Sequence, residues 1–314
     1  MGFFNMNISI CIPSYNSEKY IGETLDSIVN QTRKPFEIIV NDNASSDNTI
    51  NIVSKYPMVT ISVNPHNIGA TGNHNKCIDM AGGEYLILLS SDDCFSNNKV
   101  IENLETVIKE HNPECIALGV GRGKGNVLTY KVCSGREAIY LLFFGKLPYR
   151  QIPSMMVFKK SILDGLRIKM DSEYPQGYGD DTSFYLKIMM KSKTYINIET
   201  PMIIYRTHEE SETNIIDINE RFRIHGKILR KWVYKDYSDI LKWYGGYWVM
   251  AGEYLRVKNE MPDNQEKSKI LKYGFTTIEK TIANLRNFAI NYIPRKLKIA
   301  MKDFILNRLK NSTT

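Results

Sequence analysis

The chain has 314 residues, of which 43% are hydrophobic and 24% are charged. This is the composition of an ordinary globular protein, and it excludes collagen-like, low-complexity and largely disordered chains. The net charge of +7 suits an anionic partner but is too small to indicate a nucleic acid.

The five cysteines are widely spaced and form neither a CxxC pair nor a cluster with histidine. This pattern argues against a disulfide framework and against structural zinc, so we expect a reducing compartment. Residues 1–7 lack the basic and apolar regions of a signal peptide, and every apolar run is far shorter than the roughly 20 residues that cross a bilayer. We therefore expect a cytoplasmic protein that is soluble or peripheral to a membrane.

Apolar runs alternate with helical patterns from the start of the chain. The runs at residues 8–12, 36–40, 59–63 and 85–89 predict buried strands. The segments between them, residues 18–30, 47–54 and 71–80, predict helices. Strands separated by helices favour parallel pairing, so the sequence predicts a mostly parallel, doubly wound α/β sheet.

Polar loops follow the four predicted strands, after Ile12, Val40, Val63 and Leu89. They are rich in Asp, Asn and Ser. Because ligands bind at the carboxyl ends of the strands in such sheets, we expect these loops to line one cleft. Turn chemistry is the alternative for any single loop, and Ser46 or Asp47 would then cap a helix.

Two pairs of adjacent carboxylates are candidates for chemistry. Asp92 and Asp93 follow the fourth predicted strand, where their oxygens suit Mg²⁺ or Mn²⁺, and such an ion would neutralise a diphosphate. Solvated turn residues are the alternative. Asp180 and Asp181 precede an apolar helical pattern, where they either cap the helix or supply a general base for an acceptor hydroxyl.

Two further features stay open on the residues alone. The alternating glycines of residues 119–125 lack the following helix of a dinucleotide motif and the Ser or Thr of a P-loop, so they predict a flexible glycine hairpin. His208 follows the apolar run at residues 202–204, and a lone histidine is either structural or functional.

Beyond Ser211 aromatic and basic residues multiply and long helical stretches replace the alternation. Aromatic residues crowd positions 232–248, as packing surface or as a carbohydrate or lipid platform. Residues 295–310 predict a basic amphipathic helix that either packs on the fold or binds an anionic membrane surface.

The ordered motifs of residues 8–211 resemble family 2 glycosyltransferases with the GT-A fold, typically inverting bacterial enzymes of surface-polysaccharide assembly. The resemblance is carried by Ser9–Asn16, Asn41–Asp47, Asn67–Gly69, Ser90–Asp93, Asp180–Asp181 and Tyr205–Ser211. It implies a Rossmann-like, mostly parallel catalytic domain over residues 1–215, followed by a helical region over residues 216–314.

The resemblance also implies roles for single residues. Asp42 is then the nucleobase-binding acid, and the other nucleotide contacts are Pro13, Tyr15, Asn16, Asn67, Gly69 and Asp92. Asp92 and Asp93 would hold Mn²⁺ or Mg²⁺, with His208 near the diphosphate or the metal. Asp181 would be the catalytic base. Two departures from the family pattern are Ser90, where an acid is usual, and His74, where an arginine is common.

The implied reaction moves a hexose from a nucleotide sugar, most simply a UDP-sugar, to an acceptor hydroxyl with inversion. The acceptor would be a saccharide on a polyprenyl diphosphate, as in O-antigen or capsule assembly, and attachment to the inner face of the plasma membrane is a further hypothesis. A sugar-nucleotide pyrophosphorylase is disfavoured because the loop after the first strand is neither glycine-rich nor basic. A catalytically inactive sugar-nucleotide-binding or scaffold protein is the remaining alternative.

Overall fold

Runs of isoleucine, valine and leucine form the central strands of the protein, whose computed structural model describes residues 7–121, 127–143, 155–166 and 180–206. The first four strands are β1 (Ile8–Ser14), β2 (Glu37–Asp42), β3 (Val59–Val63) and β4 (Tyr85–Leu88). The helices between them are α1 (Ile21–Val29), α2 (Thr49–Val53) and α3 (Gly69–Met80). The predicted order of elements is confirmed over this part of the chain.

The later strands vary more in length, from two to ten residues. The strands are β5 (Cys94–Phe95), β6 (Cys115–Val120), β7 (Tyr130–Cys133), β8 (Met156–Lys159) and β9 (Tyr195–Ile204). The helices are α4 (Val100–His111), α5 (Gly135–Phe143), α6 (Lys160–Leu166) and α7 (Asp180–Lys191).

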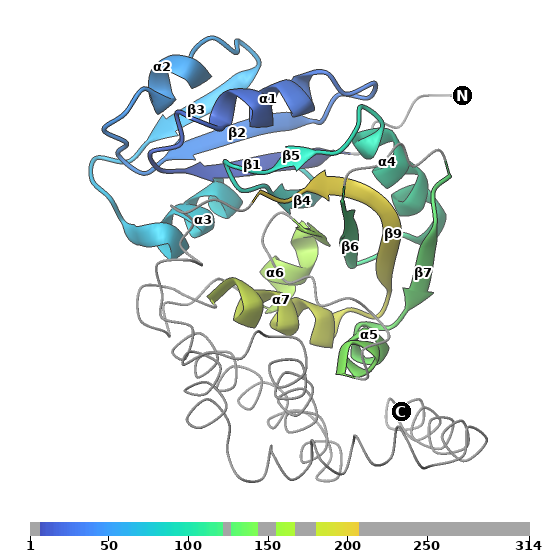
Figure 1. Cartoon of the computed structure of the whole chain (residues 1–314). Helices are drawn as coiled ribbons and strands as arrows, with labels where there is room; N and C mark the ends of the chain where they lie inside the picture. The colour runs from blue at the N-terminus through green and yellow to red at the C-terminus, as the bar shows by residue number, and fades with distance from the viewer. Residues whose placement is uncertain (1–6, 122–126, 144–154, 167–179, 207–314) are drawn as a thin grey trace, which may run out of the picture. The chain divides into compact units, whose positions relative to one another are not determined.

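One sheet contains all nine described strands, in the order β3-β2-β1-β4-β8-β6-β9-β5, with β7 also paired to β9. β3, β2, β1 and β4 are parallel to one another, β8 is antiparallel to both of its neighbours, and β6 and β9 are parallel. The sheet is therefore mixed, with the predicted parallel strands forming one half of it (Figure 1).

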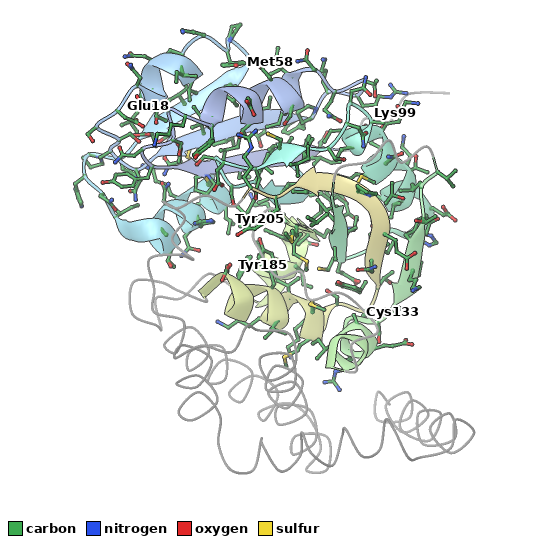
Figure 2. All side chains as sticks on the ribbon, viewed as in Figure 1. Glu18, Met58, Lys99, Cys133, Tyr185 and Tyr205 are labelled. Atoms are coloured by element: carbon green, nitrogen blue, oxygen red, sulfur yellow. The ribbon has the colours of Figure 1, made fainter. Side chains whose placement is uncertain are left out.

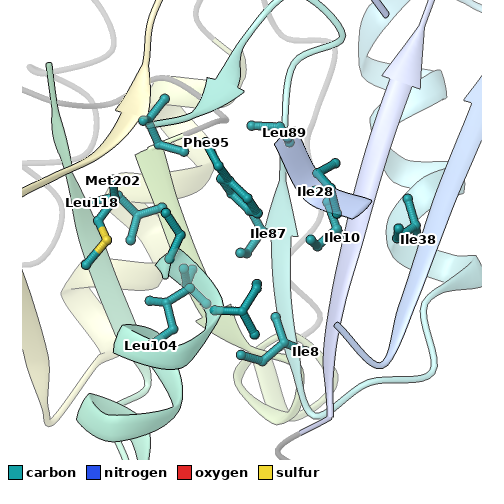
Figure 3. Packing of buried hydrophobic residues seen from close by; sticks show 14 of the residues in the cluster. Ile8, Ile10, Ile28, Ile38, Ile87, Leu89, Phe95, Leu104, Leu118 and Met202 are labelled. Atoms are coloured by element: carbon teal, nitrogen blue, oxygen red, sulfur yellow. The ribbon is translucent and has the colours of Figure 1, made fainter. Parts of the chain in front are cut away.

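Helices cover both faces of the parallel half. On one face, side chains of α1 and α4 pack with those of β1 and β4 in a core of aliphatic residues that includes Ile10, Ile28, Ile87 and Leu104 (Figure 3). On the other face, the Cys11 thiol of β1 donates to the carbonyl of Cys77 on α3 at 3.5 Å. This two-sided cover is the doubly wound arrangement predicted from the alternation.

The prediction of a hairpin at the glycine run is wrong, because the strands on either side of the run do not pair with each other. β6 and β7, which precede and follow the glycine run, both pair with β9, in parallel and antiparallel fashion respectively, so β9 lies between them. Gly119 lies in β6, where a Cβ atom would collide with the carbonyl of Thr200. Close approach of β6 to β9 thus requires a glycine at that position.

Several expectations fall partly or wholly outside the described residues. These are His208, the aromatic segment 232–248, the helix at 295–310 and the helical region 216–314. The chain divides into two compact units, of which the first comprises residues 1–138 and 149–209 and holds nearly all described residues. Within the described ranges no helix has the length and apolar character needed to cross a membrane. All five cysteines are free thiols.

Candidate active site

Three parallel strands end side by side at one edge of the sheet. Ser14 is in register with Asp42, and Asp42 with Val63. The backbone N–H of Asn43 donates to the carbonyl of Ser14, and that of Asn64 to the carbonyl of Asp42, both at 2.8 Å. The loops that follow these strands therefore meet at one edge, as predicted.

A network of buried asparagines underlies this edge. Asn73 of α3 uses its whole amide: it donates to the carbonyls of Ser14 at 3.3 Å and Asn41 at 3.0 Å, and it accepts from the amides of Asn41 and Asn64. Asn64 in turn accepts from the Lys76 ammonium group at 2.7 Å. Because buried amides are costly unless satisfied, this network fixes the relative positions of β1, β2 and the loop after β3.

Asp42 is fully buried, and its side chain stabilises the turn that follows β2. Its carboxylate accepts from the backbone N–H of Ser45 at 2.8 Å and from the Ser45 hydroxyl at 2.5 Å. Within this turn Ala44, two residues after Asp42, has a φ of 62°. The carboxylate thus stabilises the turn, and the role of Asp42 as the nucleobase acid stays a prediction.

The loop after β1 is bound to the loop after β2. Asn16 accepts from the backbone N–H of Ser46 at 2.9 Å through its side chain, while its own N–H donates to Ser45 at the same distance. Tyr15 beside it is half exposed. Asn16 therefore joins two loops, and Tyr15 presents a ring to solvent at this edge.

Asp47 precedes Asn48, the N-cap residue of α2, and its side chain binds the first turn of that helix in place of a cap from Asn48. Its carboxylate accepts from the Thr49 backbone N–H and hydroxyl at the start of α2, and from the backbone N–H of Glu18 at 3.0 Å. Burial alone would raise the pKa of Asp47, but these hydrogen bonds lower it below its ordinary value. Glu18 reciprocates by accepting from the backbone N–H of Asn48, and Figure 2 shows Glu18 close to α2.

The two acids after β4 occupy different environments. Asp93 is fully buried, and one of its carboxylate oxygens accepts from the backbone N–H of Arg206 at 3.0 Å. Asp92 is half-buried. The hydroxyl of the preceding residue, Ser91, lies 2.6 Å from that of Ser17, and the Ser91 carbonyl accepts from the Thr24 hydroxyl. The structure thus brings the fourth polar loop to the same edge as the first.

Asp180 and Asp181 are the first two residues of α7, as the helical pattern predicted. Tyr185, one turn further along α7, is completely buried. Burial, followed by the charge of Asp181, raises the pKa of Tyr185 well above its ordinary range. Asp181 itself is half-buried at the start of the helix, a position that suits either a cap or a base.

His74, which replaces the arginine common in the family, supplies no cation near neutral pH. Burial lowers the pKa of its imidazole, while the hydrogen bond at 2.8 Å between Nδ1 and the carbonyl of Ala70 opposes that shift only in part. Lys76 lies two residues further along α3 and is bound to Asn64. The helix therefore presents a neutral side chain where the resemblance suggests a positive one.

Several residues that build this edge have no role that the sequence motifs predict for them singly. They are Ser17, Asn43, Asn64, Asn73, Ser91 and Arg206. The available signal was a polar side chain at a position that the periodicity assigns to a buried face, as for Asn73 four residues before the buried Cys77. That signal does not show whether such a side chain belongs to a hydrogen-bond network or makes a single isolated hydrogen bond.

The parallel half of the sheet, with helices on both faces and four polar loops at its carboxyl edge, defines an α/β domain of the GT-A type. The family described as Glycosyl transferase family 2 matches residues 9–167. The chain therefore belongs to this family. The match favours the glycosyltransferase interpretation over the pyrophosphorylase.

Curated relatives and solved structures agree with this assignment. The chain is 28% identical over 305 residues to the poly(ribitol-phosphate) β-N-acetylglucosaminyltransferase TarP of Staphylococcus aureus, covering 92% of this chain and 89% of TarP. It is 25% identical to TarS of the same species over 66% of this chain and 36% of TarS. The crystal structure of TarS residues 1–349 in complex with UDP-GlcNAc matches 86% of this chain and 79% of that chain at 18% identity, with a TM-score of 0.65.

Proposed function

We propose that this protein transfers a sugar from a UDP-sugar to a hydroxyl group of a bacterial surface polymer, with inversion at the anomeric carbon. The match to TarP carries the proposal, because it extends over nearly the whole of both chains. UDP-N-acetylglucosamine is the first donor to test, since TarP is named for that sugar. UDP-glucose is the second, because a poly(ribitol-phosphate) β-glucosyltransferase of Bacillus spizizenii is 37% identical over 125 residues.

The acceptor favoured by these relatives is a ribitol-phosphate polymer. The lipid-linked acceptor expected from the sequence has support from WfgD of Escherichia coli, named for a diphosphoundecaprenol acceptor, but that match covers 33% of this chain. A polyol phosphate is also an anionic polymer, which suits the net charge of +7.

We assign the roles of the site residues as follows. Asp42 and the loop of Pro13, Tyr15 and Asn16 bind the uridine, with Asn67 and Gly69 at the entrance to α3. Asp181 accepts the proton of the attacking hydroxyl, because a carboxylate held near that oxygen is a suitable general base. The Asp42 carboxylate already accepts two hydrogen bonds from Ser45 in its own loop. Its role in binding the nucleobase therefore requires that the uracil edge donates to the remaining lone pairs of that carboxylate.

Asp92 fits a divalent cation. Mg²⁺ is ordinarily held by one or two carboxylates together with substrate phosphates, so the half-buried Asp92 and a donor diphosphate suffice. Asp93 is engaged by the backbone of Arg206, and among the described residues no three ligating side chains cluster. A bound Mn²⁺ or Mg²⁺ would neutralise the charge that develops on the departing diphosphate. Support comes from the structure of a mannosyltransferase of Pyrobaculum calidifontis in complex with GDP-Man and Mn²⁺, which matches 92% of this chain at 15% identity with a TM-score of 0.56.

Attachment to an anionic membrane surface remains part of the proposal for residues 295–310, which lie outside the described residues. Residues 295–310 contain six lysines and arginines. Each basic residue near an anionic leaflet contributes about 1 kcal/mol to binding, so these six would give reversible attachment. We expect the full chain to cosediment with anionic vesicles at low salt and a chain lacking residues 295–314 to stay in solution. Equal sedimentation of the two would assign this segment to the fold.

The test of the function is a transfer assay on the full chain. UDP-N-acetylglucosamine and UDP-glucose are each offered with Mn²⁺ to ribitol-phosphate oligomers and to a polyprenyl-diphosphate saccharide, and both UDP release and product mass are measured. A β-linked product from the α-linked donor supports inversion. Binding of UDP without transfer or hydrolysis for any donor would favour the inactive scaffold instead.

A further inference from the structure

The loop that carries Asp92 is fastened to the protein on both sides of that residue. Before it, Ser91 is held by the hydroxyls of Ser17 at 2.6 Å and Thr24 at 3.0 Å. After it, Asp93 accepts from the backbone N–H of Arg206. The first anchor belongs to α1 and the turn before it, and the second to the chain just beyond β9.

Arg206 also joins these two anchors through its side chain. The guanidinium group forms an ion pair with Glu23 in the first turn of α1, and it donates to the thiol sulfur of Cys94 at 2.9 Å. It lies over the ring of Tyr20, 5.6 Å from the centroid. Figure 2 labels Tyr205, which lies between the last residue of β9 and Arg206. One side chain thus contacts α1, the residue after Asp93 and the turn before α1.

These contacts constrain geometry more than they stabilise the fold. Glu23 is 72% exposed in this pair, and ion pairs that open to solvent contribute little to stability. A planar guanidinium that meets a carboxylate, a sulfur and a ring at once is nevertheless restricted to one orientation, which an ammonium group cannot reproduce. The backbone N–H of Arg206 also donates to the Asp93 carboxylate. The contacts that fix the Arg206 side chain therefore also fix the position of Asp93, the residue next to Asp92.

We propose that Arg206 is a positioning residue that, paired with Glu23, holds the Asp92–Asp93 segment against α1 so that Asp92 meets the cation and the donor diphosphate. Outer contacts of this kind commonly change metal affinity by about 10- to 100-fold when they are removed. The inference rests on the proposed function for the identity of the ligand, but not on turnover.

The test measures binding of Mn²⁺ in the presence of UDP by the loss of the free Mn²⁺ signal in electron paramagnetic resonance. We expect Arg206→Gln to weaken binding about tenfold and Glu23→Gln to weaken it less. The double variant should match Arg206→Gln, because both changes act through one contact. Lys131→Gln is the matched control: it breaks an exposed ion pair between Lys131 of β7 and Glu199 of β9, and it should bind as the wild type.

Each outcome decides the inference. Wild-type binding by Arg206→Gln, or effects that multiply in the double variant, would overturn it. If Arg206→Gln does not fold, Arg206→Lys replaces it, and we expect binding at least about threefold weaker because the planar fork is lost; wild-type binding by that variant would count against the proposal. A wild-type chain that binds Mn²⁺ and UDP yet transfers no sugar contradicts the proposed function alone, whereas one that binds neither contradicts both.

Discussion

The side-chain amide of Asn43 donates to the side-chain oxygen of Asn67 at 2.8 Å and thereby ties the end of β2 to the loop before α3. The same oxygen accepts from the backbone N–H of Gly69, the first residue of α3, which has a φ of 79°. Asn43 also accepts from the backbone N–H of Ile68 and from the Asn64 amide, both at 2.9 Å. The loop that the resemblance assigns to the donor is therefore shaped by one buried amide.

Removing the centre of the asparagine network should destabilise the domain. We expect Asn73→Leu to lower the free energy of unfolding by about 1–3 kcal/mol, because it removes one acceptor of the buried Asn41 and Asn64 amides and one donor to the Ser14 carbonyl. Urea unfolding measures the change. Asn51→Ala is the control, since Asn51 is exposed on α2 and makes one bond to Asn48, and it should cost no more than about 0.5 kcal/mol. A similar loss in both variants would contradict the buried network as the cause.

The base is assigned to the second acid of α7. Asp181→Asn should reduce turnover by about 10² or more while leaving UDP binding nearly unchanged, because an amide cannot accept the proton of the acceptor hydroxyl. Steady-state transfer and UDP titration separate the two effects. Asp180→Asn is the comparison, and an inactive Asp180→Asn beside an active Asp181→Asn would move the base by one residue.

Divalent cation should be required for transfer. Asp92→Ala should remove most of the activity, and excess EDTA should do the same to the wild type, because the diphosphate leaves as a multiply charged anion. The measurement is transfer rate against Mn²⁺ concentration for both proteins. Full activity in EDTA would show that protein groups alone neutralise the leaving group.

The partly buried His74 should make stability depend on pH. Its folded pKa is lowered by burial, so the unfolded chain takes up a proton first as the pH falls below about 6.5. Stability is fully present above that pH and is lost as the pH drops toward the folded pKa, by at most about 1.4 kcal/mol per pH unit for one proton. His74→Gln should lose less stability than the wild type between pH 7.5 and 5.5 in urea unfolding. His66→Gln, which removes an exposed imidazole, should follow the wild type.

Periodicity was sufficient to predict the elements of the parallel half. The runs around Ile10, Val40, Ile61 and Ile87 became β1 to β4. β1, β2 and β4 are buried on both faces, and short continuous apolar runs are typical of such strands. The gathering of the polar loops at one edge followed from parallel pairing. Element ends were less certain: β1 and β2 continue to the polar residues Ser14 and Asp42, since their backbones stay paired there.

Pairings between distant segments were decided only by the tertiary structure. β9 separates β6 from β7, although a glycine-rich segment joins the two in sequence, because the pairing partner of a strand depends on which segments reach the same edge. Asp93 and Arg206 are 113 residues apart, and no local pattern marks a backbone N–H as the partner of a buried carboxylate. The sequence thus predicted the residue types at the carboxyl edge, whereas the contacts that orient Asp92 arise from the packing of β9 and α1 around it.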